Sequence, residues 1–251
     1  MIIVQISDTH IDPEDENAKE RIRDLERCVQ SINGLDRRPD AVIHTGDVAH
    51  NGTPAKYLEV ARVLADLSCP LHITAGNRDD RIALNSAFPQ SCTLLSNSPY
   101  IQYSVEDYPV RLVAIDTLSG VSNQGSFCQE RAHHLRSMLA ENPTQPTAIF
   151  MHHPPFEVRQ SKFQWQFDTR EEIEILGQAL EGYAQVVRVF CGHSHREAEG
   201  VIAGVPVSCV PSVAVNLRLG DFPEIAEKAP VYQIHSFDPQ SGFVTENQTA
   251  L

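Results

Sequence analysis

Five short apolar runs, each closed by a cluster of polar residues, constrain the fold of this chain most strongly. The runs lie at residues 2–6, 41–44, 71–74, 147–151 and 186–190. Short continuous apolar runs are typical of strands that are buried on both faces. Such strands occur in α/β proteins, in which helices cover the sheet. The runs therefore predict an α/β fold.

Helix signals separate these runs, and the second half of the chain adds further strand signals. Helices are expected over 22–32 with Gly34 just past the end, from Thr53-Pro54 onwards, near Asp79, and over 129–140 and 169–181. Alternation at 101–105, followed by the run at 111–116, predicts antiparallel pairing. Strands are also expected at 198–202, 205–210, 231–237 and 243–246. The sum is a mixed sheet, or two sheets, flanked by helices.

Composition narrows the class of protein and of partner. The 251 residues suffice for one α/β domain, and no Gly/Ser-rich or Pro-rich stretch marks a linker. The net charge of −13 argues against a nucleic-acid polymer, because such binding depends on neutralising phosphates. No apolar run reaches the ~18–20 residues of a membrane span, and the N-terminus lacks the basic region of a signal peptide. The six scattered cysteines indicate reduced thiols, so we expect a cytoplasmic protein.

Each predicted buried strand is followed by a motif rich in metal-ligating side chains. The motifs are Asp8-Thr9-His10, Gly46-Asp47, Gly76-Asn77-Arg78-Asp79, His152-His153-Pro154-Pro155 and Gly192-His193-Ser194-His195. The carboxyl ends of strands in α/β folds meet at one edge and form the ligand crevice. Five loops that are distant in sequence can therefore converge on one site.

The ligand types in these motifs suit two metal ions. The seven candidate ligands are Asp8, His10, Asp47, Asn77, His152, His193 and His195. Mixed oxygen and nitrogen sets suit Mn, Fe, Zn or Co, and seven ligands are too many for one such ion. Either aspartate can bridge, because a carboxylate has two oxygens. Two ions would hold an activated hydroxide and clamp a phosphate.

In their order and spacing, these motifs resemble those of the calcineurin-like metallophosphoesterases. The longest match is HTGDVAHNGTPAKYLEVARVLADLSCPLHITAGNRDDR, joined by MHHPPF and VFCGHSHR, and the resemblance covers about residues 1–215. These strings resemble the branch of class III cyclic-nucleotide phosphodiesterases and glycerophosphodiesterases. The resemblance implies a four-layer αββα sandwich with a dinuclear metal centre. It also implies in-line attack on phosphorus by a hydroxide held by the two metals.

Carried over motif by motif, the resemblance implies a role for each ligand. Asp8, His10 and His195 are expected to hold one metal, and Asn77, His152 and His193 the other, with Asp47 as the bridge. Residues 1–215 would form the catalytic domain. Residues 216–251 would add strands that complete it and would contribute to a homodimer or larger homo-oligomer. Small anionic phosphodiesters are the expected substrates: 2′,3′- or 3′,5′-cyclic nucleotides, or glycerophosphodiesters.

Arg78 departs from the family pattern, which usually has His beside the metal-binding Asn. A guanidinium stays charged and is a poor proton donor, but its fork matches two phosphate oxygens. Arg78 is therefore expected to contact the phosphate while the site loses a general acid; the alternative is a surface arginine paired with Asp79 or Asp80. Strained rings and aryl diesters would tolerate this loss better than alkyl diesters, because acid catalysis contributes about 10²–10⁴-fold.

Three other features near the motifs each have two interpretations. His50 overlooks the site as a substrate contact and proton donor, or is a solvated loop residue. His153 is expected to support the ligands rather than bind metal. The alternating Phe163, Trp165 and Phe167 either pack in the core or stack on a nucleobase, and core packing is favoured.

Two other classes of function share this sequence pattern. A phosphomonoesterase or protein phosphatase would use the same metal core, and some related domains have lost ligands and serve as binding scaffolds. All seven ligand positions here carry competent side chains, which favours an enzyme over a scaffold. The match to the diesterase branch favours a phosphodiesterase over a phosphomonoesterase.

Overall fold

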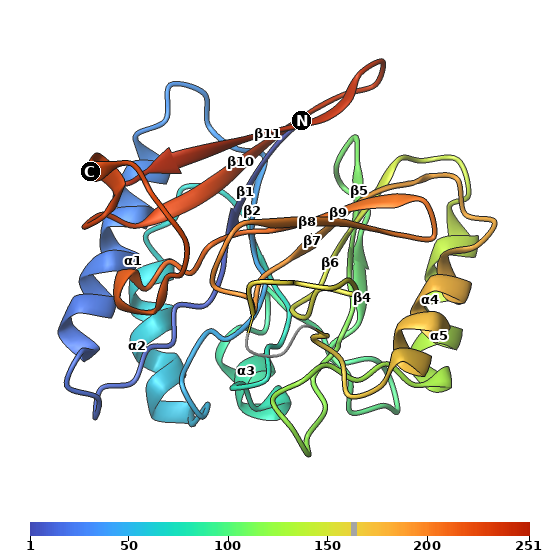
Figure 1. The fold of residues 1–251 in the computed structure, drawn as a ribbon, viewed down its shortest axis with the longest axis horizontal. Helices are drawn as coiled ribbons and strands as arrows, with labels where there is room; N and C mark the ends of the chain where they lie inside the picture. Colours follow the sequence, from blue (N-terminus) through green and yellow to red (C-terminus); the bar gives the residue numbers. More distant parts are fainter. Residues whose placement is uncertain (162–164) are drawn as a thin grey trace.

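Two β-sheets pack face to face and carry helices on both outer faces (Figure 1). The computed structural model describes residues 1–161 and 165–251. Three apolar clusters fill the three spaces between successive layers. The expected four-layer αββα sandwich is therefore confirmed.

The first sheet has the strand order β11-β10-β1-β2-β3. Parallel strands β1 (Ile2–Ile6), β2 (Ala41–His44) and β3 (Leu71–Ile73) form one part of this sheet. The C-terminal hairpin of β10 (Val231–Asp238) and β11 (Gly242–Thr249) adds to β1 in antiparallel orientation. Helices α1 (Ala18–Asn33), α2 (Pro54–Leu64) and α3 (Arg81–Ala87) supply apolar side chains to the cluster on this side.

The second sheet has the order β4-β5-β6-β7-β9-β8. Its four central strands are parallel: β5 (Arg111–Ala114), β6 (Thr147–Phe150), β7 (Val186–Cys191) and β9 (Val205–Cys209). Its edge strands β4 (Tyr103–Val105) and β8 (Ala198–Ile202) are antiparallel to their neighbours. Helices α4 (Gln129–Glu141) and α5 (Arg170–Leu180) cover its outer face (Figure 1). Short 3₁₀ helices η1 (Val215–Leu217) and η2 (Glu224–Ala226) precede β10.

The space between the sheets is an apolar core that fixes how they face each other. Ile3 and Ile43 of the first sheet belong to the same buried cluster as Leu112 and Phe150 of the second. Full burial of each such side chain contributes about 1.5–3 kcal/mol. This packing sets the carboxyl ends of the parallel strands of both sheets beside one another.

Most of the expected elements are confirmed, with shifts at their ends. Helix α1 begins at Ala18, ahead of the first periodic residue Ile22, and ends before Gly34 as expected. Thr53 occupies the N-cap position before Pro54, although its side chain makes no capping hydrogen bond. Helix α3 starts at Arg81, where the Asp80 carboxylate caps it by accepting from the amide of Ala83 at 2.8 Å.

The aromatic residues expected near the fourth motif differ in their environment. Phe167 is buried in the core beneath α4 and α5, as favoured from the sequence. The ring of Trp165 instead lies under the guanidinium of Arg170, 4.3 Å from its centre. Phe163 lies outside the described residues.

Within the described part of the chain, no helix is long and apolar enough to span a membrane.

Candidate metal centre

The loops after β1, β2, β3, β6 and β7 meet at one edge of the sandwich and bring all seven candidate ligands together. One group joins Asp8, His10 and His195, and a second joins Asp8, Asp47 and His152, with ligand atoms within 4.8 Å of one another in each group. The convergence expected from the sequence is therefore present in the fold.

The first half of the cluster contains Asp8, His10 and His195. His195 Nε2 lies 3.3 Å and His10 Nε2 lies 3.7 Å from Asp8 Oδ1. The two Nε2 atoms are 3.1 Å apart. Two imidazoles and one carboxylate therefore present ligand atoms to one small volume.

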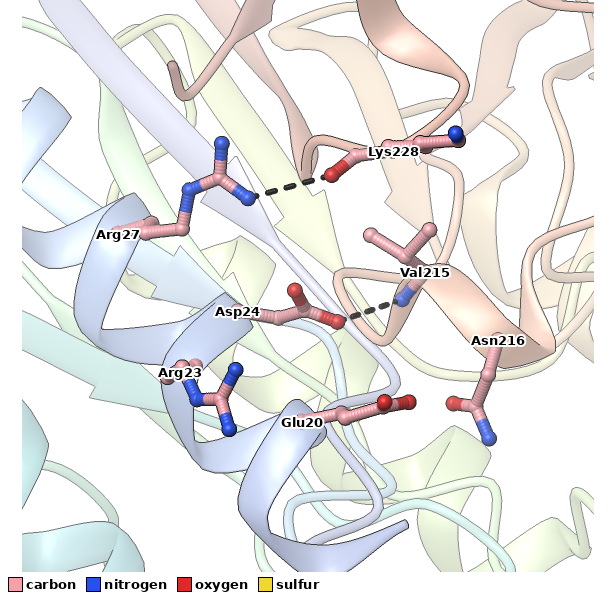
Figure 2. A pocket seen from close by; sticks show the side chains of 7 residues that line it. All are labelled: Glu20, Arg23, Asp24, Arg27, Val215, Asn216 and Lys228. Atoms are coloured by element: carbon pink, nitrogen blue, oxygen red, sulfur yellow. Dashed lines mark hydrogen bonds between the residues drawn. The ribbon is translucent and has the colours of Figure 1, made fainter.

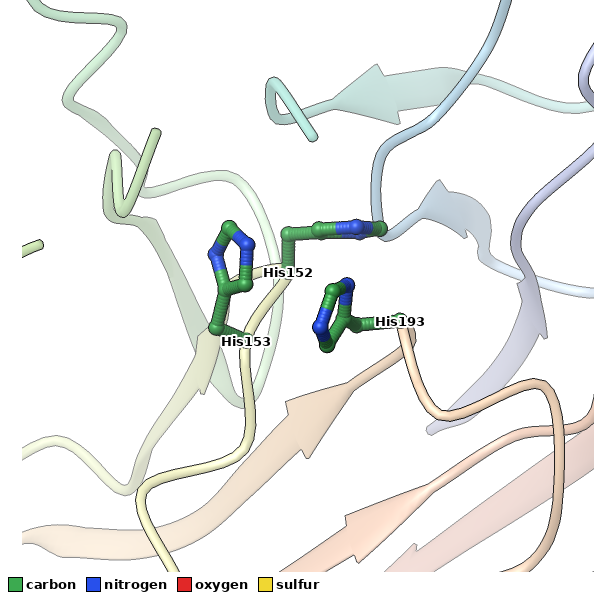
Figure 3. A group of neighbouring side chains, drawn as sticks. All are labelled: His152, His153 and His193. Atoms are coloured by element: carbon green, nitrogen blue, oxygen red, sulfur yellow. The ribbon is translucent and has the colours of Figure 1, made fainter. Parts of the chain in front are cut away.

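The second half contains Asn77, His152 and His193. Asn77 Oδ1 lies 3.1 Å from His152 Nε2 and 2.9 Å from His193 Nδ1. Figure 3 shows the rings of His152 and His193 close together, with ring centres 5.0 Å apart. An amide oxygen and two imidazole nitrogens thus converge here.

Asp47 lies between the two halves. Its Oδ2 is 3.3 Å from His10 Nε2 in the first half and 3.5 Å from His152 Nε2 in the second. Its Oδ1 is occupied, because it accepts a hydrogen bond from the backbone amide of Arg78 at 2.7 Å. One carboxylate oxygen therefore faces both groups of ligands.

Backbone carbonyls orient two of the histidines. His152 Nδ1 is 2.7 Å from the carbonyl oxygen of Thr45, and His195 Nδ1 is 3.1 Å from that of Leu217. A proton on each Nδ1 leaves Nε2 as a lone-pair donor toward the cluster, as in many metal sites. Neither Thr45 nor Leu217 was expected from the sequence, because a carbonyl contact carries no residue-type signal.

The ligand loops are held in unusual backbone conformations. Asp8, His10, Asp47, His193 and His195 all have positive φ, between 44° and 64°. Residues other than glycine adopt this region rarely, and such strain clusters at functional sites. The motif glycines permit close approach: a Cβ on Gly76 would lie 2.2 Å from the Asp47 backbone nitrogen. The GD and GN motifs are therefore packed against each other.

The electrostatics of the cluster couple its acids to its imidazoles. Burial alone would raise the pKa of the Asp8 carboxyl, but His195 and His10 hold that pKa well below its usual value. Burial disfavours charge on His152 as well, yet Asp47 outweighs it and raises the pKa of His152 to about 9. Burial and His152 lower the pKa of His193 to about 3. The cluster therefore favours ionised carboxylates beside at least one positive charge.

Divalent metal ions fit this donor set. Asp8 Oδ1 is buried and has no hydrogen-bond partner in the described part of the chain, although four neighbouring ligand groups surround it. A buried acceptor without a partner is costly unless a cation or a donor satisfies it. The mixture of two carboxylates, one amide and four imidazoles matches Mn, Fe, Zn or Co.

Arg78 stands at the rim of the cluster with its backbone fixed on both sides. Its amide donates to Asp47, and its carbonyl accepts from Gly52 at 2.8 Å. Within residues 1–161 and 165–251, its guanidinium makes no hydrogen bond or ion pair, and the expected alternative of a pair with Asp79 or Asp80 is not formed. Asp79 instead accepts from backbone amides, and Asp80 caps α3.

His50 lies behind His10 as seen from the cluster. Its Nδ1 is 3.5 Å from His10 Nδ1, whereas His10 turns its Nε2 toward the carboxylates. Burial, together with His10 and Arg78, lowers the pKa of His50. Its role as a proton donor stays a prediction.

His153 is next to the cluster, but both its ring nitrogens have protein partners. Nδ1 is 2.8 Å from the Thr117 hydroxyl, and Nε2 is 3.3 Å from the Asn123 carbonyl oxygen. Its ring centre is 4.4 Å from that of His193 (Figure 3). His153 therefore ties the loop around residues 117–125 to the ligand loops.

A cavity of about 330 Å³ lies behind the first half, between α1 and η1 (Figure 2). Asp24 on its wall accepts a hydrogen bond from the Val215 amide at 2.9 Å. Arg21 reaches from α1 to the His10 carbonyl at 2.9 Å and to Asn216 at 3.3 Å. These contacts fix η1, whose Leu217 carbonyl orients His195.

Comparison of the chain with known proteins points to one family. A family model described as Calcineurin-like phosphoesterase matches residues 1–197. A probable glycerophosphodiester phosphodiesterase GpdQ from Arcobacter nitrofigilis is 29% identical, over 98% of this chain and 92% of its own. A cAMP/cGMP dual specificity phosphodiesterase from Mycobacterium tuberculosis is 27% identical, over 82% of this chain and 65% of its own. A dimetal phosphatase from Danio rerio shares the fold with a TM-score of 0.76 at 14% identity, covering 100% of this chain and 96% of its own.

Proposed function

Because the chain belongs to the calcineurin-like phosphoesterase family, we propose that it is a metal-dependent phosphodiesterase acting on small phosphodiesters. The position of Asp47 Oδ2, 3.3 Å from His10 and 3.5 Å from His152, carries this proposal. A carboxylate shared by two ligand groups is what a dinuclear centre requires.

In this proposal, Asp8, His10 and His195 hold one metal ion, and Asn77, His152 and His193 hold the other. Asp47 would contact both. Two divalent ions there would supply positive charge for a bound phosphate and lower the pKa of a water molecule. Their charge would exceed that of the two carboxylates, so the site would attract anions although the protein carries −13.

Two classes of small diester are the proposed substrates. The relatives with similar sequences are named as glycerophosphodiester phosphodiesterases and as cyclic nucleotide phosphodiesterases. Both substrate types present one anionic phosphate between two alkyl oxygens. The net charge of −13 disfavours nucleic-acid polymers as alternatives.

Arg78 is the proposed phosphate clamp in place of a general acid. Its backbone is held beside Asn77 and Asp47 by two hydrogen bonds, and within residues 1–161 and 165–251 its guanidinium has no hydrogen-bond partner, which supports a role in phosphate binding. A fork of N–H donors binds two phosphate oxygens but does not release a proton. His50 and Asn77 are the other two proposed substrate contacts, and His50 is the candidate donor of a proton to the leaving oxygen.

Rates on a matched set of esters test the proposal. The Mn-loaded protein is given bis(p-nitrophenyl) phosphate, 2′,3′-cAMP, 3′,5′-cAMP, a glycerophosphodiester and p-nitrophenyl phosphate. We expect the aryl diester and 2′,3′-cAMP to be fastest, because their leaving groups or strained ring need little acid catalysis. A monoester hydrolysed faster than every diester would instead establish the phosphomonoesterase alternative.

Variants of Arg78 separate binding from proton transfer. Arg78→Lys keeps the charge but loses the fork, so KM for the aryl diester should rise about tenfold, because a charged hydrogen bond contributes about 1.5–3 kcal/mol. Arg78→His should raise the rate on 3′,5′-cAMP relative to the aryl diester. An unchanged ratio in Arg78→His would remove the argument that Arg78 replaces an acid.

The predictions of domain division, oligomeric state and cellular location also stay proposals. Residues 1–215 would be the catalytic domain, and residues 216–251 would complete it and contribute to a dimer or larger homo-oligomer. The cytoplasm is the proposed location. Sedimentation of the purified protein tests the oligomer, and fractionation of cells tests the location.

A further inference from the structure

Asp79 joins the loops that carry Asp47 and Asn77. Its Oδ2 accepts from the amides of Gly76 at 2.9 Å and Val48 at 3.2 Å. Its Oδ1 accepts from the amide of Ala49 at 3.3 Å. Val48 and Ala49 follow Asp47, and Gly76 precedes Asn77. One buried carboxylate thus spans a ligand loop from each of two strands.

Tyr57 of α2 bonds to both Asp79 and Asp80 through its hydroxyl. Its hydroxyl donates to Asp79 Oδ1 at 2.9 Å and accepts from the Asp80 amide at 2.9 Å. The ring is fully buried and packs edge-on against Phe88. A Cβ on Gly52 would lie 2.0 Å from the Tyr57 hydroxyl. Tyr57 therefore accounts for the second glycine of the GDVAHNG motif.

The same contacts fix Arg78 from both ends. Gly52, which makes room for the Tyr57 hydroxyl, donates its amide to the Arg78 carbonyl at 2.8 Å. The Arg78 amide donates to Asp47 Oδ1 at 2.7 Å. The next residue is Asp79 itself. A shift of Asp79 would therefore move Arg78, Asn77 and Asp47 together.

From these contacts we infer that Tyr57 and Asp79 are positioning residues that hold Asp47, Asn77 and Arg78 in register for metal and phosphate binding. The inference rests on the proposed function, because it assigns the two residues to that metal centre. Among the residues that the structure describes, the carboxylate of Asp79 accepts from four donors, and the hydroxyl of Tyr57 bonds to Asp79 and Asp80 and to no ligand of the cluster.

Tyr57→Phe tests the inference, with Tyr232→Phe as a matched control. Tyr232 is equally buried in the same apolar cluster, and in the described part of the chain its hydroxyl has one hydrogen-bond partner, Ser31, at 2.9 Å. Tyr57→Phe loses two hydrogen bonds and Tyr232→Phe loses one, so the melting temperature of both variants should fall, and that of Tyr57→Phe should fall further. Only Tyr57→Phe should weaken Mn²⁺ binding, by about tenfold in calorimetric titration, since outer-shell partners of a metal site affect affinity by about 10–100-fold.

Asp79→Asn should have the larger effect, because its amide nitrogen cannot accept the hydrogen bonds that Asp79 now accepts. We expect about 100-fold weaker Mn²⁺ binding and a lower kcat on bis(p-nitrophenyl) phosphate. If Asp79→Asn fails to fold, Tyr57→Phe decides. The KM of Tyr57→Phe should also rise, because Arg78 loses its fixed position.

Two results would overturn the inference. One is a Tyr57→Phe protein that binds Mn²⁺ with wild-type affinity and keeps its kcat and KM. The other is a Tyr232→Phe protein that loses as much Mn²⁺ affinity as Tyr57→Phe, which would reduce the effect to general stability. A wild-type protein that binds Mn²⁺ but hydrolyses no diester would refute the proposed function and not the inference. The Mn²⁺ affinities of the variants would still test the positioning role of Tyr57 and Asp79.

Discussion

Histidines are buried in two places: at the metal edge, where the loops of the seven candidate ligands meet, and in the space between the two sheets. The hydrogen-bond partners of the imidazoles differ between these two places. His152 at the edge and His235 on β10 are both fully buried. His235 has a side-chain partner on each ring nitrogen: Thr245 at 2.9 Å and Gln5 at 3.0 Å. His152 has the Thr45 carbonyl on one nitrogen and turns the other toward Asn77 and Asp47.

The difference separates a histidine with a structural role from a candidate metal ligand. His44 and His153 lie next to the ligands, yet each has both nitrogens within hydrogen-bond reach of protein groups outside the cluster. His195 follows the pattern of His152, with Leu217 on one side and Asp8 on the other. His152 and His195 thus share one arrangement: an imidazole with one nitrogen on a backbone carbonyl and the other facing a carboxylate.

Asp47→Asn should have the largest effect, because Asp47 faces both halves of the cluster. We expect kcat/KM on bis(p-nitrophenyl) phosphate to fall about 10³-fold, near the upper range for losing one preorganised electrostatic group. Steady-state rates at saturating Mn²⁺ measure this. An activity within tenfold of wild type would mean that the two halves do not share a bridging group.

His152→Gln and His235→Gln form a matched pair that tests the comparison itself. His152→Gln should lower Mn²⁺ affinity about 10–100-fold or more, because it removes a donor from the cluster. His235→Gln should leave Mn²⁺ affinity unchanged and lower the free energy of unfolding by about 1–3 kcal/mol. Calorimetric titration and urea unfolding measure the two quantities. Equal losses of affinity would break the distinction between the two regions.

Removal of metal should destabilise only proteins with an intact cluster. An ion that binds the folded state stabilises it by about 2.7 kcal/mol when its free concentration is 100 times Kd. EDTA should therefore lower the melting temperature of wild type and His235→Gln alike, and that of His152→Gln much less. A wild-type melting temperature that does not change when EDTA is added would contradict this expectation.

The pH dependence of stability should show the smallest effect. Burial, reinforced by Arg188, lowers the pKa of His235 to about 3, from about 6.5 in the unfolded chain. Below the pKa that His235 has in the unfolded chain, the unfolded state binds a proton at this imidazole and the folded state does not. The free energy of unfolding therefore falls as pH falls. From about pH 6.5 to about 5.5 the wild type should lose about 1 kcal/mol more than His235→Gln. Parallel curves from urea unfolding would contradict the assignment.

The sequence predicted the inner strands well and the edges of elements poorly. Largely apolar runs marked β1, β2 and β6, because strands buried on both faces have few polar positions. The last strand β11 extends to Thr249, past the expected 243–246, because its outer half is polar and lies at the sheet edge. Helix α1 begins at Ala18, before its apolar periodicity starts.

The convergence of the seven candidate ligands was predictable, but the contacts that orient them were not. Residue type and position after a strand pointed to Asp8, Asp47 and His152 directly. The Leu217 carbonyl is far from His195 in sequence, and a backbone contact has no residue signature. Tyr57 lies among the buried residues of α2, and an apolar pattern alone does not show that its hydroxyl bonds to Asp79.

The number and place of bound metal ions test the central claim most directly. Crystals soaked with Mn²⁺ and measured for anomalous scattering should show two peaks at the metal edge. One peak should lie among Asp8, His10 and His195, the other among Asn77, His152 and His193, with Asp47 touching both. A single peak, or peaks elsewhere while diester hydrolysis persists, would contradict the dinuclear account.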